Sequence, residues 1–414
     1  MNDAVMMPPR AELPAVPAVS NRRESPILPA GLTDEEVVSR WLQAKGTGRG
    51  RLSPTTLAQY RTEAERLFWY VRRIGRELST WTIDEFSAYV SFLSKPEPWA
   101  IRARGVRRGT PEWRPFLGPL SDASAGQSQK IVTSLLGWMR DAGYLAANPA
   151  SGLPTVGRSR TEKQARFLPP VDTALIREAI AARREPSTEA RLKKARDRFA
   201  LDLFEYVGLR TIEAIRGQMN DVQVLPLPEE LRTEHPDAPP FQWLLRVKRG
   251  KGGKARWVPC DEIAVTFQTY RVAFGLPPIP ASDDTRPLLM SVRRARPEGE
   301  ILQQRKGFGG KKENRSGIWK LIRRLCLEAQ EWATRQGRHH DAARLKAAST
   351  HWLRHSYAKG LAAAVSHGLD PRAALENMGH DDLRTFNQYV DDEPAKRAFA
   401  TAIARKAAVH KSAT

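Results

Sequence analysis

The chain has 414 residues, too many for one ordinary hydrophobic core and enough for two domains. Its 67 Lys and Arg exceed its 46 Asp and Glu, which gives a formal net charge of +21 and a pI near 10.3. This excess favours nucleic acid as the partner, because neutralised phosphates release counterions. An anionic membrane surface or a merely soluble basic protein is a weaker alternative, since basic residues recur along the whole chain and do not form one amphipathic helix or one tail.

The cysteines and the hydropathy exclude several classes of protein. Cys260 and Cys326 are the two cysteines and lie far apart, which argues against a disulfide framework or a cysteine zinc site and predicts two small core residues. No stretch approaches the roughly 18 consecutive apolar residues of a membrane span. The N-terminus lacks the apolar core of a signal peptide. We therefore expect a cytoplasmic protein without a membrane partner.

The first part of the chain predicts a tail followed by a helical bundle. Residues 1–31 are rich in Pro, Ala and charge without periodicity, which predicts a flexible or loosely attached tail. Residues 32–155 predict helices: Ser53-Pro54 is typical of a helix start, and Thr82 with Glu85 of a capping box. Apolar residues recur on one helical face at Leu57, Tyr60, Ala64, Leu67, Phe68 and Val71. A further helix carries Ile131, Val132, Leu135, Trp138 and Met139 and ends near Gly143.

Two basic segments interrupt or follow this bundle. Residues 97–120 form an irregular insertion with arginines at 102, 104, 107 and 108. This pattern fits a solvated loop and a loop that follows a phosphate backbone equally well. Residues 156–168 are basic and polar and predict an interdomain linker.

Residues 169–395 predict a second domain of helices with a few strands. Helical patterns cover residues 171–182 and 195–206, another helix begins after Arg210, and helices dominate from Ile318 onward. Short β-rich segments at 242–247 and 254–258 flank the glycine-rich stretch 248–253, which predicts a β-hairpin. Residues 225–240 are rich in proline and predict a surface insertion.

The last part of the chain gathers groups suited to phosphodiester chemistry. Arg354 follows His351 by three positions, so both side chains lie on one face of a helix, and His380 and Tyr389 come soon after. Attack by a protein nucleophile builds negative charge on the oxygens around phosphorus, which arginine stabilises without losing its proton. A phenol with an ordinary pKa near 10 also needs a base, and the leaving oxygen needs a proton donor.

Four sequence boxes carry a resemblance to a known family. They are Val207-Gly208-Leu209-Arg210-Thr211-Ile212-Glu213, Gly250-Lys251-Gly252-Gly253-Lys254-Ala255-Arg256-Trp257-Val258-Pro259, His351-Trp352-Leu353-Arg354-His355-Ser356, and Met378-Gly379-His380 with Gln388-Tyr389-Val390. In this order they resemble the catalytic domain of the tyrosine recombinase, or phage integrase, family. The resemblance implies a multidomain, mainly α protein. A helical, SAM-like core-binding domain would precede a mixed α/β catalytic domain with a small antiparallel sheet.

The resemblance also implies a role for each residue. Arg210 and Arg354 clamp the scissile phosphate, Glu213 supports the site, and Lys251 protonates the leaving 5′ oxygen, with Lys254 as the less favoured candidate. His351 assists proton transfer and His380 hydrogen-bonds the phosphate. Tyr389 is the nucleophile. His355 is interpreted as a structural, hydrogen-bonded helix residue.

The implied activity is site-specific recombination of double-stranded DNA through a 3′-phosphotyrosyl intermediate, without metal or nucleotide cofactor. The partners would be DNA and further copies of the chain, in a homo-oligomer that is a tetramer on paired sites. Residues 396–414 could be exchanged between protomers, and an accessory directionality factor is a further possible partner. The expected location is the cytoplasm, at the nucleoid.

Three alternatives remain beside this reading. A type IB topoisomerase uses a similar site to relax DNA, and a catalytically silent DNA-binding regulator could keep the fold. A metal-dependent nuclease is the remotest alternative. A metal held by His351 and His355 is disfavoured, because no glutamate lies between them and the cation of Arg354 opposes it.

Overall fold

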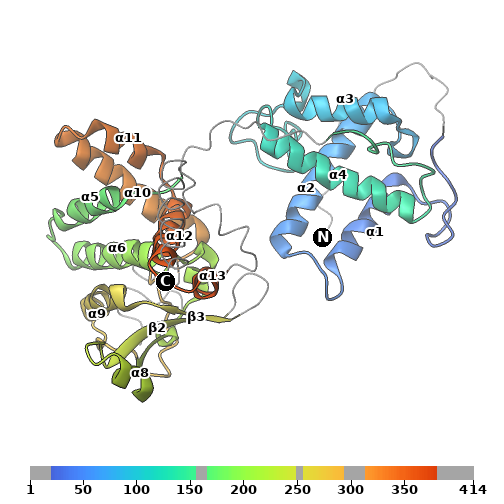
Figure 1. Cartoon of the computed structure of the whole chain (residues 1–414). Coiled ribbons are helices and arrows are strands. Elements are labelled where there is room, and N and C mark those ends of the chain that lie inside the picture. Colours follow the sequence, from blue (N-terminus) through green and yellow to red (C-terminus); the bar gives the residue numbers. More distant parts are fainter. Residues whose placement is uncertain (1–19, 155–165, 249–254, 293–312, 380–414) are drawn as a thin grey trace, which may run out of the picture. The chain divides into compact units, whose positions relative to one another are not determined.

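The computed structural model describes residues 20–154, 166–248, 255–292 and 313–379 (Figure 1). The chain divides into two compact units, Met1–Glu162 and Lys163–Thr414, and the boundary falls inside the predicted linker. Each unit has its own cluster of buried apolar residues. Two cores are what the chain length led us to expect.

Unit 1 is helical throughout its described part. Its helices are α1 (Asp34–Gly46), α2 (Pro54–Ile74), α3 (Ile83–Ser94) and α4 (Asp122–Asp141), with short 3₁₀ turns at Leu78–Thr80 and Pro98–Ala100. The predicted starts are confirmed: the Ser53 side chain accepts a hydrogen bond from the Thr56 N–H, and the capping box of Thr82 and Glu85 is present. The predicted apolar face of α2 is buried at Ala64, Leu67, Phe68 and Val71, and half-buried at Leu57 and Tyr60.

The predicted N-terminal tail is attached to unit 1 over its described residues, 20–31. The Asn21 side chain exchanges two hydrogen bonds of 2.9 Å with the backbone of Ala147, and the Arg23 N–H donates to the Tyr144 carbonyl at 2.9 Å. The prediction of a loosely attached tail is therefore wrong for residues 20–31. The composition of this segment is typical of a loop, and nothing in the sequence indicated that it pairs with residues 144–147, more than a hundred positions away.

The basic insertion 97–120 is held at its base. Ile101 and Phe116 form an isolated parallel β-bridge, and the Arg102 N–H donates to the Phe116 carbonyl at 2.9 Å. The rings of Trp99 and Trp113 lie 6.4 and 6.3 Å from the ring of Trp69, which is buried on α2. Aromatic packing of this kind stabilises the loop beyond simple area burial.

Unit 2 contains one small antiparallel sheet with the order β1-β2-β3, formed by β1 (Val222–Pro226), β2 (Phe241–Val247) and β3 (Arg256–Pro259). The two strands of the predicted hairpin are thus confirmed, while its turn at 249–254 lies outside the described residues. Val222 pairs with Leu245, which pairs with Val258, and all three side chains are buried. One face of the sheet therefore joins the core.

The proline-rich segment 225–240 is more structured than the sequence indicated. Leu225 and Pro226 belong to β1 and pair with Gln242 and Phe241, and α8 (Glu229–Glu234) follows. The strand β1 was missed because its proline is typical of a loop and is disfavoured in a central strand. Proline is tolerated here because β1 lies at the edge of the sheet.

Further helices complete unit 2. They are α5 (Pro170–Ala181), α6 (Thr188–Tyr206), α7 (Thr211–Arg216), α9 (Ala264–Ala273), α10 (Arg315–Arg335), α11 (His339–Ala347), α12 (Thr350–Ser366) and α13 (Pro371–Met378), with 3₁₀ turns at Met219–Asp221 and Asp261–Ile263. Cys260 and Cys326 are both buried in this core, as predicted. Leu168 was assigned to the linker, but it is buried in the same core and its backbone exchanges hydrogen bonds with the Ser356 hydroxyl.

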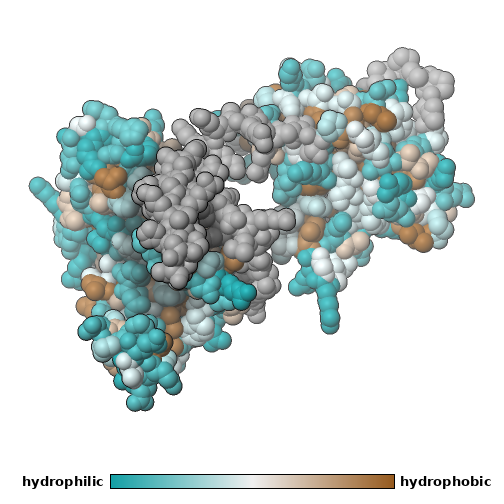
Figure 2. Space-filling view, viewed as in Figure 1, coloured by the Kyte–Doolittle hydropathy of each residue, from teal (hydrophilic) through white to brown (hydrophobic). Residues whose placement is uncertain are grey.

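The surface is largely polar on the face drawn in Figure 2, where hydrophobic residues form only small separate patches among the coloured atoms. Within the described ranges, no helix is both long and apolar enough to cross a bilayer.

Candidate active site

Three segments of unit 2 that are distant in sequence line one cleft of about 390 Å³. Arg210 comes from the start of α7, and His351 and Arg354 come from the first two turns of α12. The remaining lining residues are Leu209, Thr211, Ile212, Arg315, Trp319, Ser349 and Thr350. The structure therefore brings together both predicted phosphate-clamp arginines and the predicted acid/base histidine.

A glycine makes the approach of these segments possible. Gly208 lies between α6 and α7 with φ of 61°, in the left-handed region that favours glycine. A Cβ atom at this position would lie 2.1 Å from a ring carbon of Tyr357 on α12. The Arg354 guanidinium donates to the Gly208 carbonyl. The turn before Arg210 and the helix that carries Arg354 are thus packed directly on each other.

The carboxyl end of α13 is held by three arginines. Arg354 donates to the Met378 carbonyl, Arg210 Nη2 donates to the Gly379 carbonyl at 2.9 Å, and Arg256 Nε donates to the Asn377 carbonyl at 3.2 Å. The last carbonyls of a helix lack intrahelical partners and carry partial negative charge, so cations stabilise them. Gly379 is followed in the sequence by His380, so the residue before a predicted site residue is hydrogen-bonded to Arg210, one of the two predicted clamp arginines.

Glu213 lies between two of these arginines. Its carboxylate accepts from Arg210 Nη1 at 2.9 Å and from both terminal nitrogens of Arg256 at 3.0 and 2.9 Å. Burial by itself raises the pKa of Glu213, but the hydrogen bonds and charges of Arg256 and Arg210 outweigh it and lower the pKa to about 2. Glu213 is therefore a charged, buried counter-ion, which agrees with its predicted supporting role.

His351 lies in a cationic environment. Burial, and then the charges of Arg354, Arg210 and Arg166, lower the pKa of His351. A neutral imidazole at neutral pH is able to accept a proton. The neighbouring ring of His355 lies 4.5 Å away in an edge-on arrangement, and burial together with the charges of His351 and Arg354 lowers the pKa of His355 to about 4.

The predicted site residues Lys251, His380 and Tyr389 lie outside the described residues, as do Lys254 and the segment 396–414. Their roles remain predictions. Arg210, Glu213, His351 and Arg354 are the predicted residues that the structure places, and all four lie in or directly beside the cleft.

Sequence reasoning missed three residues of this region. Arg256 belongs to the predicted hairpin, but the sequence did not indicate that it pairs with Glu213. The one available indication was general: a buried carboxylate such as Glu213 needs positive neighbours. Arg315 and Trp319 line the cleft from α10. Their spacing of four places both on one helical face, but nothing in the sequence indicated which face.

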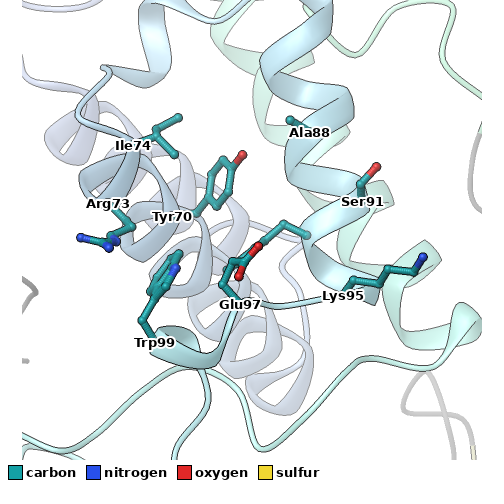
Figure 3. A pocket seen from close by; sticks show the side chains of 9 residues that line it. Tyr70, Arg73, Ile74, Ala88, Ser91, Lys95, Glu97 and Trp99 are labelled. Atoms are coloured by element: carbon teal, nitrogen blue, oxygen red, sulfur yellow. The ribbon is translucent and has the colours of Figure 1, made fainter. Parts of the chain in front are cut away.

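Two further observations delimit the site. Across the described ranges, no group of three or more His, Cys, Asp or Glu side chains is placed to hold a metal ion. Unit 1 has a separate hollow of about 580 Å³ between α2 and α3, where Tyr70, Arg73 and Trp99 lie opposite Ala88 and Ser91 (Figure 3). None of the predicted catalytic residues comes from unit 1.

Comparison with known proteins agrees with this geometry. The model of the phage integrase family matches residues 178–396, more than half of the chain. Among curated relatives, the tyrosine recombinase XerD of Staphylococcus epidermidis is 28% identical over 275 residues, which cover 66% of this chain and 75% of that protein. XerD of Staphylococcus saprophyticus is 26% identical over the same length.

Solved structures share the fold at low sequence identity. XerH site-specific recombinase bound to a palindromic difH substrate matches with a TM-score of 0.54 and 16% identity, over 89% of this chain and 84% of that one. The Tn1549 transposon integrase in complex with transposon right end DNA matches with a TM-score of 0.54 and 15% identity, over 90% and 100% of the two chains. A lambda integrase tetramer bound to a Holliday junction matches with a TM-score of 0.51 and 12% identity, over 90% of this chain and 79% of that one. On the family match and the similarity to these recombinases, the chain belongs to the phage integrase family and is a tyrosine site-specific recombinase.

Proposed function

We propose that Tyr389 is the nucleophile of this recombinase, that Arg210 and Arg354 hold the scissile phosphate, and that Lys251, His351 and His380 move protons or bind phosphate oxygens. The Tyr389 phenolic oxygen forms a bond to phosphorus while the bond from phosphorus to the 5′ oxygen breaks. The phenolic proton passes to a base, and Lys251 gives a proton to the leaving oxygen. Attack by the 5′ hydroxyl of a partner strand reverses the step and joins the exchanged strands.

The convergence of Arg210, Arg354 and His351 on one cleft carries this proposal. Fixed guanidinium groups stabilise the charge that develops on the phosphate oxygens without reorganisation. The lowered pKa of His351 supports a role as proton acceptor, because it keeps the imidazole neutral near pH 7. A bound phosphate would add negative charge and make His351 more basic as the reaction begins.

The proposal extends to the partners. The substrate is double-stranded DNA. The structurally similar XerH is bound to a difH substrate and the Tn1549 integrase to transposon right end DNA, and the net charge of +21 of this chain supports a DNA substrate. We propose a tetramer on paired sites, with residues 396–414 exchanged between protomers, and allow an accessory directionality factor. A protein that recombines chromosomal or mobile DNA would act in the cytoplasm at the nucleoid.

The decisive experiment replaces Tyr389 by Phe. The full-length protein is incubated with labelled DNA that flanks its gene, the reaction is stopped with detergent, and covalent adducts are separated on a denaturing gel. Wild type is expected to form an adduct, and Tyr389→Phe to form none while binding the same DNA with nearly equal affinity. An adduct that survives the substitution would refute the assignment of the nucleophile.

The same preparation separates recombination from topoisomerase activity. Supercoiled plasmid of arbitrary sequence is not expected to be relaxed efficiently, because cleavage by a recombinase needs its own site. Efficient relaxation without such a site would favour the type IB alternative. Failure to trap any adduct on nicked flanking DNA would favour a silent regulator.

A further inference from the structure

The cleft of unit 2 extends beyond the predicted phosphate clamp. Arg210, Arg354 and His351 supply its cationic part, and α10 adds Arg315 and Trp319. These two residues are the first and fifth of α10, so their side chains lie on one face of the helix. No box of the sequence motif includes them.

Trp319 on α10 is exposed to solvent, as is Trp257 on β3, which does not line the cleft. The relative exposure of Trp319 is 50%, whereas Trp41, Trp69 and Trp81 in unit 1 are at most 2% exposed. The neighbouring residue Ile318 is 1% exposed and anchors α10 in the core. An exposed indole on a firmly packed helix, at the rim of a cationic cleft, is a contact surface for an apolar part of a ligand.

Arg315 is exposed and has no ion pair or side-chain hydrogen bond within the described part of the chain. The start of α12 faces the same cleft through Ser349 and Thr350. Thr350 is only 7% exposed, and its hydroxyl has no hydrogen-bond partner among the described residues. A buried hydroxyl without a partner is disfavoured, and a rotation of the side chain would let it donate to an anionic oxygen in the cleft.

We propose that Arg315 and Trp319 form a subsite for the nucleotide that adjoins the scissile phosphate. The indole of Trp319 contacts its deoxyribose, and the Arg315 guanidinium binds its outer phosphate. This inference rests on the proposed function, because it takes Arg210 and Arg354 as the clamp of the first phosphate. The ligand is therefore a sugar between two phosphates. Arg210 and Arg354 bind one phosphate, and Arg315 binds the other.

Binding of small nucleotides tests the subsite without knowledge of the DNA target. The full-length protein is titrated by calorimetry with thymidine 3′,5′-bisphosphate, with thymidine 3′-monophosphate and with inorganic pyrophosphate. The bisphosphate is expected to bind about tenfold more tightly than the monophosphate, as one further charged hydrogen bond would give. It should also bind more tightly than pyrophosphate, which carries the charge but no sugar.

Variants assign these two preferences to the two residues. Arg315→Ala is expected to remove the preference for the bisphosphate over the monophosphate. Trp319→Ala is expected to remove the preference for the bisphosphate over pyrophosphate, and Trp319→Phe should retain most of that second preference. Lys320→Ala and Leu327→Ala are the controls, because both change exposed residues of α10 that do not line the cleft. Thermal unfolding of each variant checks that the fold is intact.

The subsite is overturned if wild type binds the three ligands equally or not at all, or if both preferences survive in Arg315→Ala and Trp319→Ala. If only one of the two substitutions removes its preference, the two-residue assignment is overturned, and only the residue whose substitution had an effect contacts the ligand. These outcomes do not depend on cleavage. An intact subsite without a Tyr389-dependent adduct would contradict the proposed function, and an adduct without the nucleotide preferences would contradict the subsite.

Discussion

At the scale of single residues, the charge balance of the active site depends on Glu213. Its side chain is 1% exposed and lies between Arg210 and Arg256, of which Arg256 is also largely buried. An acid in this position keeps two guanidinium groups close together, and Arg210 still lines the cleft. Arg256 does not line the cleft and acts by positioning Glu213 and the end of α13.

We expect Glu213→Gln to lower the free energy of unfolding by about 3 kcal/mol, because it leaves two neighbouring arginines without their buried counter-ion. The measurement is urea unfolding at pH 7. In an Arg256→Met background the same substitution should cost less, since one of the two unpaired charges is gone. An equal cost in both backgrounds would contradict the coupling.

The pKa of Glu213 also predicts how this difference changes with pH. The folded-state pKa of about 2 lies below the ordinary value of 4.5, so the carboxylate contributes its full stability above about pH 4.5 and loses it as the pH falls toward 2. The stabilities of wild type and Glu213→Gln should therefore converge over this range. A difference that stayed constant down to pH 2.5 would argue against a charged Glu213.

Gly208 is the residue where backbone conformation and close packing coincide. Gly208→Ala is expected to destabilise unit 2 by about 3 kcal/mol or more, because it combines a strained positive φ with a clash against Tyr357. Gly275→Ala is the matched control, since Gly275 has φ of 73° but open space around the added methyl. Thermal unfolding should show a clearly larger loss at position 208, and equal losses would contradict the close approach.

At the scale of elements, the basic insertion 97–120 combines a packed base with free cations. Arg102 and Arg114 stack over Trp113 and Trp69 at 5.6 and 5.3 Å, which uses these arginines for the loop itself. Arg104 and Arg107 are exposed, and neither side chain has an ion pair or hydrogen bond within the described ranges. Arg104 and Arg107 are therefore the residues that can distinguish a DNA-facing loop from a solvated one, the two alternatives that the sequence left open.

We expect replacement of Arg104 and Arg107 by Ala to weaken DNA binding and to reduce the slope of log affinity against log salt concentration by about two units. The measurement is fluorescence anisotropy with labelled duplex DNA at several salt concentrations. Replacing both by Lys is the control, because it keeps the charges and should leave the slope unchanged. An unchanged slope in the alanine variant would indicate that the loop is solvated and does not contact DNA.

At the scale of the whole molecule, the chain consists of two units with separate cores. Each core contains many fully buried large side chains, and each such side chain contributes about 1.5–3 kcal/mol. Linking two binding modules in one chain raises the effective concentration of the second module once the first is bound. We therefore predict that the two units together bind DNA more tightly than either unit alone.

We expect fragments 20–154 and 166–414 to fold separately, each with a cooperative thermal transition by circular dichroism, and their summed spectra to resemble that of the intact chain. Each fragment should bind duplex DNA at least about 100-fold more weakly than the whole protein, because joining two modules adds affinity without new contacts. A fragment that stays unfolded alone would contradict the independence of the cores.

Local patterns in the sequence predicted most helices and the order of the site residues. Capping boxes, an N-terminal serine with proline and a period of 3.6 are properties of residues within one or two turns, so α2, α3 and α4 needed no tertiary information. The strand β1 and the attached residues 20–31 were missed because their partners are distant or their composition is typical of loops. The family resemblance pointed to Arg210, Glu213, His351 and Arg354, and spacing alone placed His351 and Arg354 on one helical face.

Tertiary structure determined what those residues contact. Arg354 reaches the carbonyl of Gly208, 146 positions away, and Arg210 reaches that of Gly379, 169 positions away. The pairing of Arg256 with Glu213 and the exposure of Trp319 likewise depend on how α7, α10, α12 and β3 pack. Periodicity fixes which side of a helix is apolar, but only packing between distant segments fixes which polar groups meet on its other side.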